Sequence, residues 1–279
     1  MTTQHIRFLF MLMGGALAAA AAPVRAATPE PIESLHYADL ADLSLPAQIV
    51  AKVRISEEIE LQPKPGTTVV SGHVQVYLEA DIEALIKGPQ DVPRHVAYIA
   101  DLVRDSQGRP PKIKKSAQLI FAHIVSGRSG FVQLIAPDAD LIWSPAREST
   151  VRQIITSSSA ADSPPRVIGI DSAFSAAGTI PGERETQIFL QTESQPVSIT
   201  VTRRAGETAR WSVALGEIAD NGSPPPLRDT LLWYRLACTL PIHMPHPKLA
   251  ALPADQLDAV NEDYDLVRVE LGACERSRR

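Results

Sequence analysis

Side chains that could hold a metal or take part in redox chemistry gather in residues 231–247. His243, Met244 and His246 follow one another closely there, and an imidazole pair with a thioether suits copper in an exported protein. Two histidines do not make a metal site. Further ligands would have to come from the histidines of the first half, His36, His73, His95 and His123. We therefore predict no metal and no cofactor, and metal handling through His243 and His246 stays open as an alternative.

The same stretch holds Cys238, one of only two cysteines in the chain. The other is Cys274, and an even count in an exported protein favours a disulfide bond. Reactive thiols lie in electropositive, partly exposed settings, and the sequence around Cys238 indicates no such setting. Residues 227–240 are typical of an apolar core helix rather than an aromatic binding site. We therefore predict a structural disulfide between Cys238 and Cys274.

Motifs of hydrolytic enzymes are missing from the sequence. The chain has neither the G-x-S-x-G motif of a serine nucleophile nor a phosphate-binding glycine loop. Residues 126–130 place a serine between glycines, but with the spacing of a hairpin turn. Acidic pairs such as Asp138 and Asp140 are typical of solvated loops. We predict no catalytic residue. A hydrolase whose residues meet only in the fold remains an alternative, with His123, Ser129 and Asp138 as its first candidates.

Residues 1–26 have the pattern of a secretory signal peptide. A weakly positive start with Arg7 precedes the apolar residues 8–22, and Val24 and Ala26 supply small side chains at the cleavage positions. The apolar run is short for a membrane span, which needs about 20 residues. We therefore predict cleavage between Ala26 and Ala27 and a periplasmic location for the remaining chain.

The charge of the chain argues against a nucleic-acid partner. The full sequence has 27 basic and 32 acidic residues, a net charge of −5. Loss of Arg7 and Arg25 with the signal leaves 25 basic residues and a net charge of −7. Nucleic acids are bound by basic surfaces. After signal removal we also expect no membrane span, because no other stretch is long and apolar enough.

A polar, proline-bearing stretch near the middle of the chain, residues 157–166, divides it into two halves. We predict one domain over residues 27–160 and a second over 161–279. The composition and pattern of both halves indicate a mainly β, α+β chain. We find no internal repeat at a fixed period.

Alternating apolar and polar residues predict the strands of the first half. They are expected within residues 49–62, 72–88, 94–103, 118–127 and 131–137, and a helix within 144–157. Glu57 interrupts the first alternation and predicts a bulge. The basic loop 109–115 could hold an anion, but lysines beside a strand more often prevent edge pairing between molecules, and we favour that interpretation. Five closely spaced strands suggest a small closed or nearly closed barrel.

The order of a long strand ending in ALIKG, a basic hairpin GRPPKIKK and the strand LIFAH resembles the OB-fold domains of exported proteins. The tissue-inhibitor-of-metalloprotease-like domains are one branch of these. The resemblance covers about residues 47–136 and implies an OB-like β-barrel. Inhibitors of that branch use an amino-terminal cysteine, which this half does not contain, so their mechanism does not carry over.

The second half predicts an antiparallel meander packed against a helix. Its strands are expected within residues 185–192, 196–204 and 210–218, and residues 166–174 are a candidate for one more. Asp229 is the expected cap of the helix at 227–240. Residues 253–263 predict a short helix and residues 264–274 a closing strand, with Val267, Val269 and Leu271 on one face.

The whole chain resembles an uncharacterised group of exported proteins of Gram-negative bacteria, which implies a compartment and no activity. With no catalytic constellation in the sequence, we expect a non-catalytic binding or scaffold module. Its ligand is unknown, and another periplasmic or envelope protein is the partner that this compartment suggests.

Overall fold

The computed structural model describes residues 35–62, 70–216, 222–245 and 252–278. The predicted signal peptide and its cleavage site at Ala26 and Ala27 lie outside this part of the chain. Residues 35–279 form one compact unit. None of the helices in the described ranges is long and apolar enough to cross a membrane.

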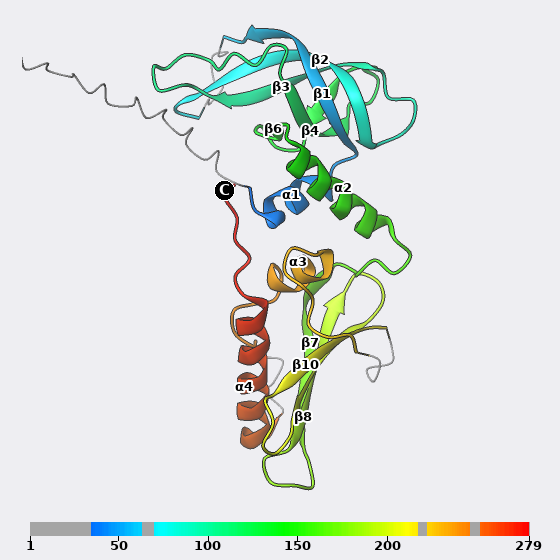
Figure 1. Ribbon diagram of the computed structural model, residues 1–279, viewed down its shortest axis with the longest axis vertical. Helices are drawn as coiled ribbons and strands as arrows, with labels where there is room; N and C mark the ends of the chain where they lie inside the picture. Colours follow the sequence, from blue (N-terminus) through cyan, green and yellow to red (C-terminus); the bar gives the residue numbers. More distant parts are fainter. Residues whose placement is uncertain (1–34, 63–69, 217–221, 246–251, 279) are drawn as a thin grey trace, which may run out of the picture. The chain divides into compact units, whose positions relative to one another are not determined.

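In the described ranges, strands outnumber helices, and most of the strands lie where alternation predicts them. The elements of the first half are α1 (Tyr37–Ser44), β1 (Ile49–Glu60), β2 (His73–Lys87), β3 (His95–Val103), β4 (Ala117–Ile124), β5 (Val132–Leu134), β6 (Asp140–Ile142) and α2 (Pro145–Ser159). Those of the second half are β7 (Val167–Ala177), β8 (Arg184–Thr192), β9 (Val197–Arg203), β10 (Arg210–Leu215), α3 (Leu231–Ala237) and α4 (Ala254–Leu271). The prediction of a mainly β, α+β chain is confirmed (Figure 1).

The first sheet has the strand order β3-β2-β1-β4-β5, and β6 pairs with β4. All of its ladders are antiparallel. Alternation buries one face of β2, where Val74, Val76, Leu78 and Ala80 point into the core. The bulge predicted at Glu57 is confirmed, because the register between β1 and β2 shifts between Ile55 and Glu57.

The two outer strands of this sheet, β3 and β5, approach one another without forming a ladder. The backbone N–H of Ala97 donates to the Gly130 carbonyl at 2.8 Å, and that of Asp101 donates to the Pro137 carbonyl at 2.8 Å. A single parallel bridge joins Ala97 to Phe131. The described residues therefore hold a curved sheet whose edges touch, and the closed barrel is not found.

The helix α2 begins as the sequence predicts. The side chain of Ser144 accepts a hydrogen bond from the Arg147 N–H at 3.2 Å, and Pro145 occupies the first turn. Proline suits this position because its missing N–H would have no partner there. Val151 and Ile154 are buried, so this helix is attached to the core by one narrow face.

The second sheet has the order β10-β9-β8-β7 and is antiparallel throughout. The meander of β8, β9 and β10 is confirmed, and the candidate strand before it is β7. The red helix α4 runs alongside this sheet and packs against β7 and β8 (Figure 1).

The predicted closing strand at 264–274 is wrong, because residues 254–271 form one continuous helix. Val267, Val269 and Leu271 also fit a period of two, which misled the prediction. Only Val267 and Leu271 are buried, whereas Val269 is 78% exposed. Together with Val260 and Tyr264, the buried pair repeats every three or four residues, the spacing of one helical face.

The helix α3 is shorter than predicted and begins elsewhere. The side chain of Thr230 caps it by accepting a hydrogen bond from the Trp233 N–H at 3.3 Å, so the predicted cap Asp229 is wrong. Its core position is confirmed, since Trp233 is 3% exposed. The indole N–H of Trp233 donates to the Leu271 carbonyl at 2.8 Å and so ties α3 to the end of α4.

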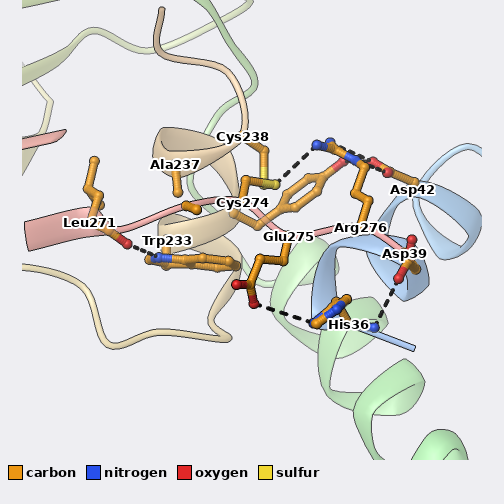
Figure 2. The surroundings of a disulfide bond; sticks show 12 residues. His36, Asp39, Asp42, Trp233, Ala237, Cys238, Leu271, Cys274, Glu275 and Arg276 are labelled. Carbon is orange, nitrogen blue, oxygen red and sulfur yellow. Dashed lines mark hydrogen bonds and ion pairs between the residues drawn. A yellow bond between two sulfur atoms is a disulfide. The ribbon is translucent and has the colours of Figure 1, made fainter. Parts of the chain in front are cut away.

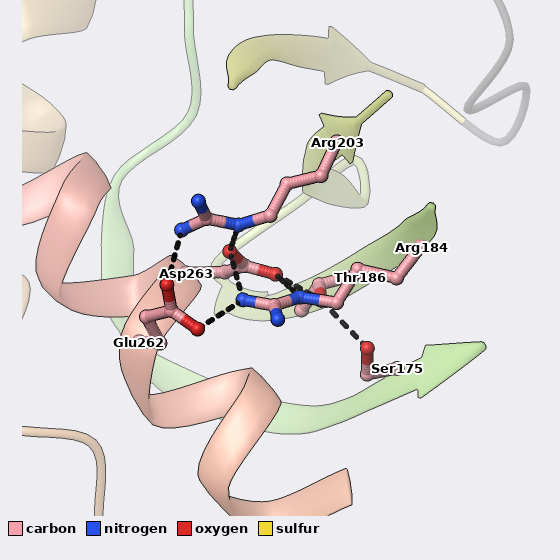
Figure 3. A network of polar contacts seen from close by, with 6 residues as sticks. All are labelled: Ser175, Arg184, Thr186, Arg203, Glu262 and Asp263. Carbon is pink, nitrogen blue, oxygen red and sulfur yellow. Dashed lines mark hydrogen bonds and ion pairs between the residues drawn. The ribbon is translucent and has the colours of Figure 1, made fainter. Parts of the chain in front are cut away.

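A buried carboxylate joins α4 to the second sheet. Asp263 has no exposed side-chain surface, and Arg184 and Arg203 each donate to it, at 2.9 and 2.6 Å (Figure 3). Thr186 donates its hydroxyl to the same carboxylate at 2.5 Å. Glu262, on the exposed side of the helix, pairs with both arginines. Every oxygen of Asp263 is thus paired where water does not reach it.

Contacts cross the predicted domain boundary at residues 157–166. The rings of Tyr37 and Trp233 meet edge to face with centroids 6.3 Å apart, and the Tyr234 hydroxyl donates to Asp42 at 2.6 Å. The buried hydrophobic side chains of both halves belong to one cluster. The two-domain division itself stays a prediction.

Proteolysis within residues 157–166 is expected to leave the halves associated. This stretch comprises the end of α2 and the loop 160–166. The contacts of α1 with α3 do not pass through it, so a nicked chain should elute as one species in native buffer. In urea it should separate into two fragments, because Cys238 and Cys274 both follow the cut and no disulfide joins the halves. Elution of separate fragments in native buffer would contradict this expectation.

Candidate functional site

The outer face of the first sheet carries large apolar side chains among polar ones. Alternation that buries the even residues of β2 places Tyr77 on the opposite face, where it pairs across the ladder with Ile99 of β3. Ile99 is 42% exposed, and Ile59 of β1 and Val103 of β3 are exposed as well. We call Ile59, Tyr77, Ile99, Val103 and the adjoining Phe131 the outer apolar face.

The segment 125–131, which joins β4 to β5, lies against this face. The rings of Phe131 and Tyr77 stack with centroids 6.4 Å apart. The guanidinium of Arg128 lies over the Phe131 ring, 5.9 Å from its centroid. Gly130 has a φ of 79°, a conformation that glycine adopts without strain, and its carbonyl accepts the bond from β3. The segment is therefore held in place at both the backbone and the aromatic ring.

Two grooves open on either side of segment 125–131. One of about 490 Å³ lies between this segment and residues 89–93. The other, of about 530 Å³, lies between β3 and residues 131–137, and Ile99, Arg128 and Phe131 help to line it. The second groove is the seam between β3 and β5, bounded by the hydrogen bonds at Ala97 and Asp101.

A histidine between two carboxylates borders the outer apolar face. The Nδ1 of His95 lies 3.1 Å from Asp81, and its Nε2 lies 3.5 Å from Glu79. The hydrogen bond with Asp81, followed by the charges of both carboxylates, raises the pKa of His95. The Tyr77 hydroxyl donates to Glu79 at 3.2 Å, which links this charged rim to the aromatic stack.

A second titratable pair, Tyr98 and Asp140, lies on the inner side of the first sheet. The Tyr98 hydroxyl donates to Asp140 Oδ2 at 3.0 Å, while Asp140 Oδ1 is buried without a hydrogen-bond partner. Burial raises the pKa of Asp140 to about 7. The interpretation of Asp140 as a solvated loop carboxylate is therefore wrong, because β6 turns it toward the core.

Asp140→Asn is expected to stabilise the protein at pH 8 by about 2 kcal/mol. The folded state keeps the Asp140 proton up to about pH 7, whereas an exposed aspartate releases it near 3.8, so folding stability falls as the pH rises between these values. Asparagine removes this fall and keeps an acceptor for Tyr98. Urea unfolding of both proteins from pH 4 to 8 measures the effect. Asp138→Asn is the matched control, and a wild-type curve that is flat over this range would contradict the assignment.

The residues of the hydrolase alternative are not joined into a catalytic arrangement. Asp138 is bound to the Arg278 guanidinium at 2.5 Å, so its carboxylate is occupied. Ser129 lies in segment 125–131, and His123 is an exposed residue of β4. No hydrogen bond joins His123, Ser129 and Asp138 among the described residues.

The histidines of the metal-handling alternative are not both visible in the described part of the chain. His243 is exposed, and His246 lies outside the described residues. Within the described ranges, no group of three or more histidine, cysteine and acidic side chains is placed to hold a metal ion.

The structure pairs the two cysteines and attaches the carboxyl-terminal tail, residues 272–278, to α1. The sulfur atoms of Cys238 and Cys274 lie 2.09 Å apart, at disulfide distance. Beyond Cys274, Arg276 donates to Asp42 at 2.6 Å (Figure 2). The buried carboxylate of Asp39 accepts the backbone N–H groups of Ser277 and Arg278 at 3.0 Å each.

The basic loop at 109–115 has its charges partly neutralised. Arg109 pairs with Asp105 at 2.8 Å, and Lys114 pairs with Glu57 at 2.8 Å. Glu58 accepts the backbone N–H groups of Ile113 and Lys114, which fixes the loop against β1. These contacts favour a structural role over an anion site.

A comparison with protein-family models finds no match to this chain, and a comparison with curated proteins finds none either.

Proposed function

We propose that the chain is a non-catalytic binding module of the periplasm that holds another polypeptide of the cell envelope on its outer apolar face. The single observation that carries this proposal is the pair of grooves beside segment 125–131: Phe131, stacked on Tyr77, lines both of them, and exposed Ile99 lines the second. Grouped apolar side chains with a polar rim are typical of interaction sites.

An OB-like first domain is part of this proposal. It is supported by the strand order β3-β2-β1-β4-β5 together with the hydrogen bonds that join β3 to residues 130–137. OB folds bind oligonucleotides and oligosaccharides across the face of strands 2 and 3, with the loop between strands 1 and 2 and the loop between strands 4 and 5. The outer apolar face and segment 125–131 occupy the corresponding places.

A polypeptide fits this site better than a nucleic acid does. The chain is acidic, with a net charge of −5, and Glu79, Asp81 and Asp101 lie on the same face of β2 and β3 as Ile99. The backbone N–H groups of Ala97 and Asp101 donate toward residues 130–137, which holds the seam in place on either side of Ile99.

The proposal is tested by co-purification of a tagged protein from the periplasm. Ile99→Glu places a charge in the centre of the outer apolar face, and Val269→Glu makes the same change at an exposed site on α4. We expect the polypeptides recovered with the wild-type protein to be lost with Ile99→Glu and kept with Val269→Glu. Equal recovery with both variants would contradict the proposal. Amino-terminal sequencing of the same preparation tests export, which predicts a start at Ala27.

A further inference from the structure

The two sulfur atoms of the disulfide differ in their direct contacts with cations. On one side, Nη1 of Arg276 donates to the Sγ of Cys274 at 3.1 Å (Figure 2). The same guanidinium is held by Asp42, with Nε to Oδ2 at 2.6 Å. The hydrogen bond to Asp42 raises the pKa of Arg276, so the cation beside Cys274 persists at every physiological pH. A cation in contact with a sulfur stabilises its thiolate.

Cys238, in contrast, is the carboxyl-terminal cap of α3. The carbonyl groups at the end of a helix carry the negative end of its dipole and disfavour an anion there. Two arginines lie near this turn, Arg235 in the last turn of α3 and Arg268, which donates to the Ala237 carbonyl at 3.2 Å. Among the described residues, neither is found in contact with a sulfur atom. Both cysteines are half-buried rather than sealed in the core.

We propose that Cys238 is the site at which an external thiol forms a mixed disulfide, with Cys274 as the leaving group beside Arg276. The leaving sulfur is the one whose thiolate is better stabilised. In the first step, the attacking thiolate forms a bond to Cys238 Sγ while the Cys238–Cys274 bond breaks, and its electron pair remains on Cys274 as a thiolate.

A dithiol completes the exchange. Its second thiol loses a proton to water, and the resulting thiolate attacks the other sulfur of the dithiol, the one bonded to Cys238. This forms a disulfide within the dithiol and expels Cys238 as a thiolate. The dithiol is thereby oxidised to a disulfide, and the protein gains two electrons. Without the disulfide, the tail is held to α1 and Asp138 by hydrogen bonds and partly exposed ion pairs alone, which are individually weak. The exchange therefore removes the covalent link between the tail and α3 and leaves these contacts to hold the tail.

The direction of the exchange is measured by trapping. The native protein is exposed briefly to glutathione and separately to a dithiol, dithiothreitol, then quenched in acid, and peptides are analysed by mass spectrometry. With glutathione, the adduct should be on Cys238, about tenfold over Cys274. With dithiothreitol, both cysteines should appear as free thiols. Equal labelling, preference for Cys274, or no adduct on the native protein would each overturn the proposal.

Two arginine variants separate the effect of the cation from loosening of the tail. Arg276→Gln removes the cation beside Cys274, and Arg278→Gln removes a tail contact with Asp138 that does not touch the sulfur. Reduction by dithiothreitol should be at least about threefold slower in Arg276→Gln than in wild type, and unchanged or faster in Arg278→Gln. If loosening of the tail were the only effect, reduction would be faster in both variants than in wild type. Faster reduction of Arg276→Gln would therefore contradict the role assigned to the guanidinium.

Discussion

Asp263→Ala is expected to lower the free energy of unfolding by about 3 kcal/mol. Removal of one partner from a buried ion pair leaves the others uncompensated, and here Arg184, Arg203 and the Thr186 hydroxyl lose their common acceptor. The two arginine side chains are 23% and 25% exposed, so water can solvate their charges when the carboxylate is removed. The expected loss of stability is therefore at the low end of the range for buried ion pairs. Urea unfolding monitored by circular dichroism measures the difference.

Glu262→Ala is the matched control for Asp263→Ala. Glu262 contacts the same two arginines from the next position of α4, but its side chain is 58% exposed. Exposed ion pairs contribute at most about 1 kcal/mol, so the control should lose no more than that. Equal losses in the two variants would show that the buried carboxylate has no special part in holding α4 to the sheet.

The contribution of Asp263 should also depend on pH. Burial by itself raises the pKa of this carboxyl, but hydrogen bonds from Arg184, Thr186 and Arg203 outweigh burial, and the pKa lies below its usual 3.8. The unfolded chain therefore binds the proton first as the pH falls. The stability difference between wild type and Asp263→Ala should be constant above about pH 5 and should shrink below pH 3.8.

Cys274→Ser is expected to lower the free energy of unfolding by about 3 to 4 kcal/mol, the chain-entropy value for a loop of this size. The two cysteines are 36 residues apart, and the loop between them contains the whole of α4. Thermal melting of the wild-type and variant proteins measures the effect. Cys238→Ser should give the same loss, because either change opens the same bond.

A thiol count provides an independent check on the disulfide. If the chain is exported as proposed, protein unfolded without reduction should show no free thiol. Two free thiols, or a Cys274→Ser protein as stable as wild type, would contradict a structural disulfide.

Much of the fold can be predicted from local sequence patterns, because they record which face of each element is buried. The alternation of β2 predicts its inner face from Val74 to Ala80, and Ser144 with Pro145 predicts the start of α2. The Cys238–Cys274 pairing follows from the count of two cysteines in a chain predicted to be exported. The first two inferences need only residues that are close in the sequence. The third needs only that the sequence has no third cysteine to compete for the bond.

Features that depend on distant residues are the ones that sequence reasoning misses. Val267, Val269 and Leu271 fit both a strand and a helix, and only the sheet beneath α4 decides that Val269 faces outward. Asp140 resembles a loop residue until β6 pairs with β4 and turns it inward. The cation beside Cys274 is held in place by Asp42, far earlier in the chain.

The outer apolar face gives a weak signal in the sequence. Tyr77 and Ile99 are apolar residues on strand faces that otherwise carry His95, Glu79 and Asp101, so each breaks the expected alternation. One apolar residue on the polar face of a single strand does not predict a binding site. The site can be recognised only when the β2–β3 register places Tyr77 opposite Ile99 and Phe131 stacks on Tyr77.

The central claim, that this face holds a polypeptide of the cell envelope, is tested most directly by site-specific photo-crosslinking in living cells. A photoreactive residue is placed at Ile99 in one strain and at Val269, equally a surface position, in another. We predict one discrete, reproducible adduct from position 99 that contains a second polypeptide and is absent from position 269. No adduct at position 99, or the same set of adducts from both positions, would contradict the claim.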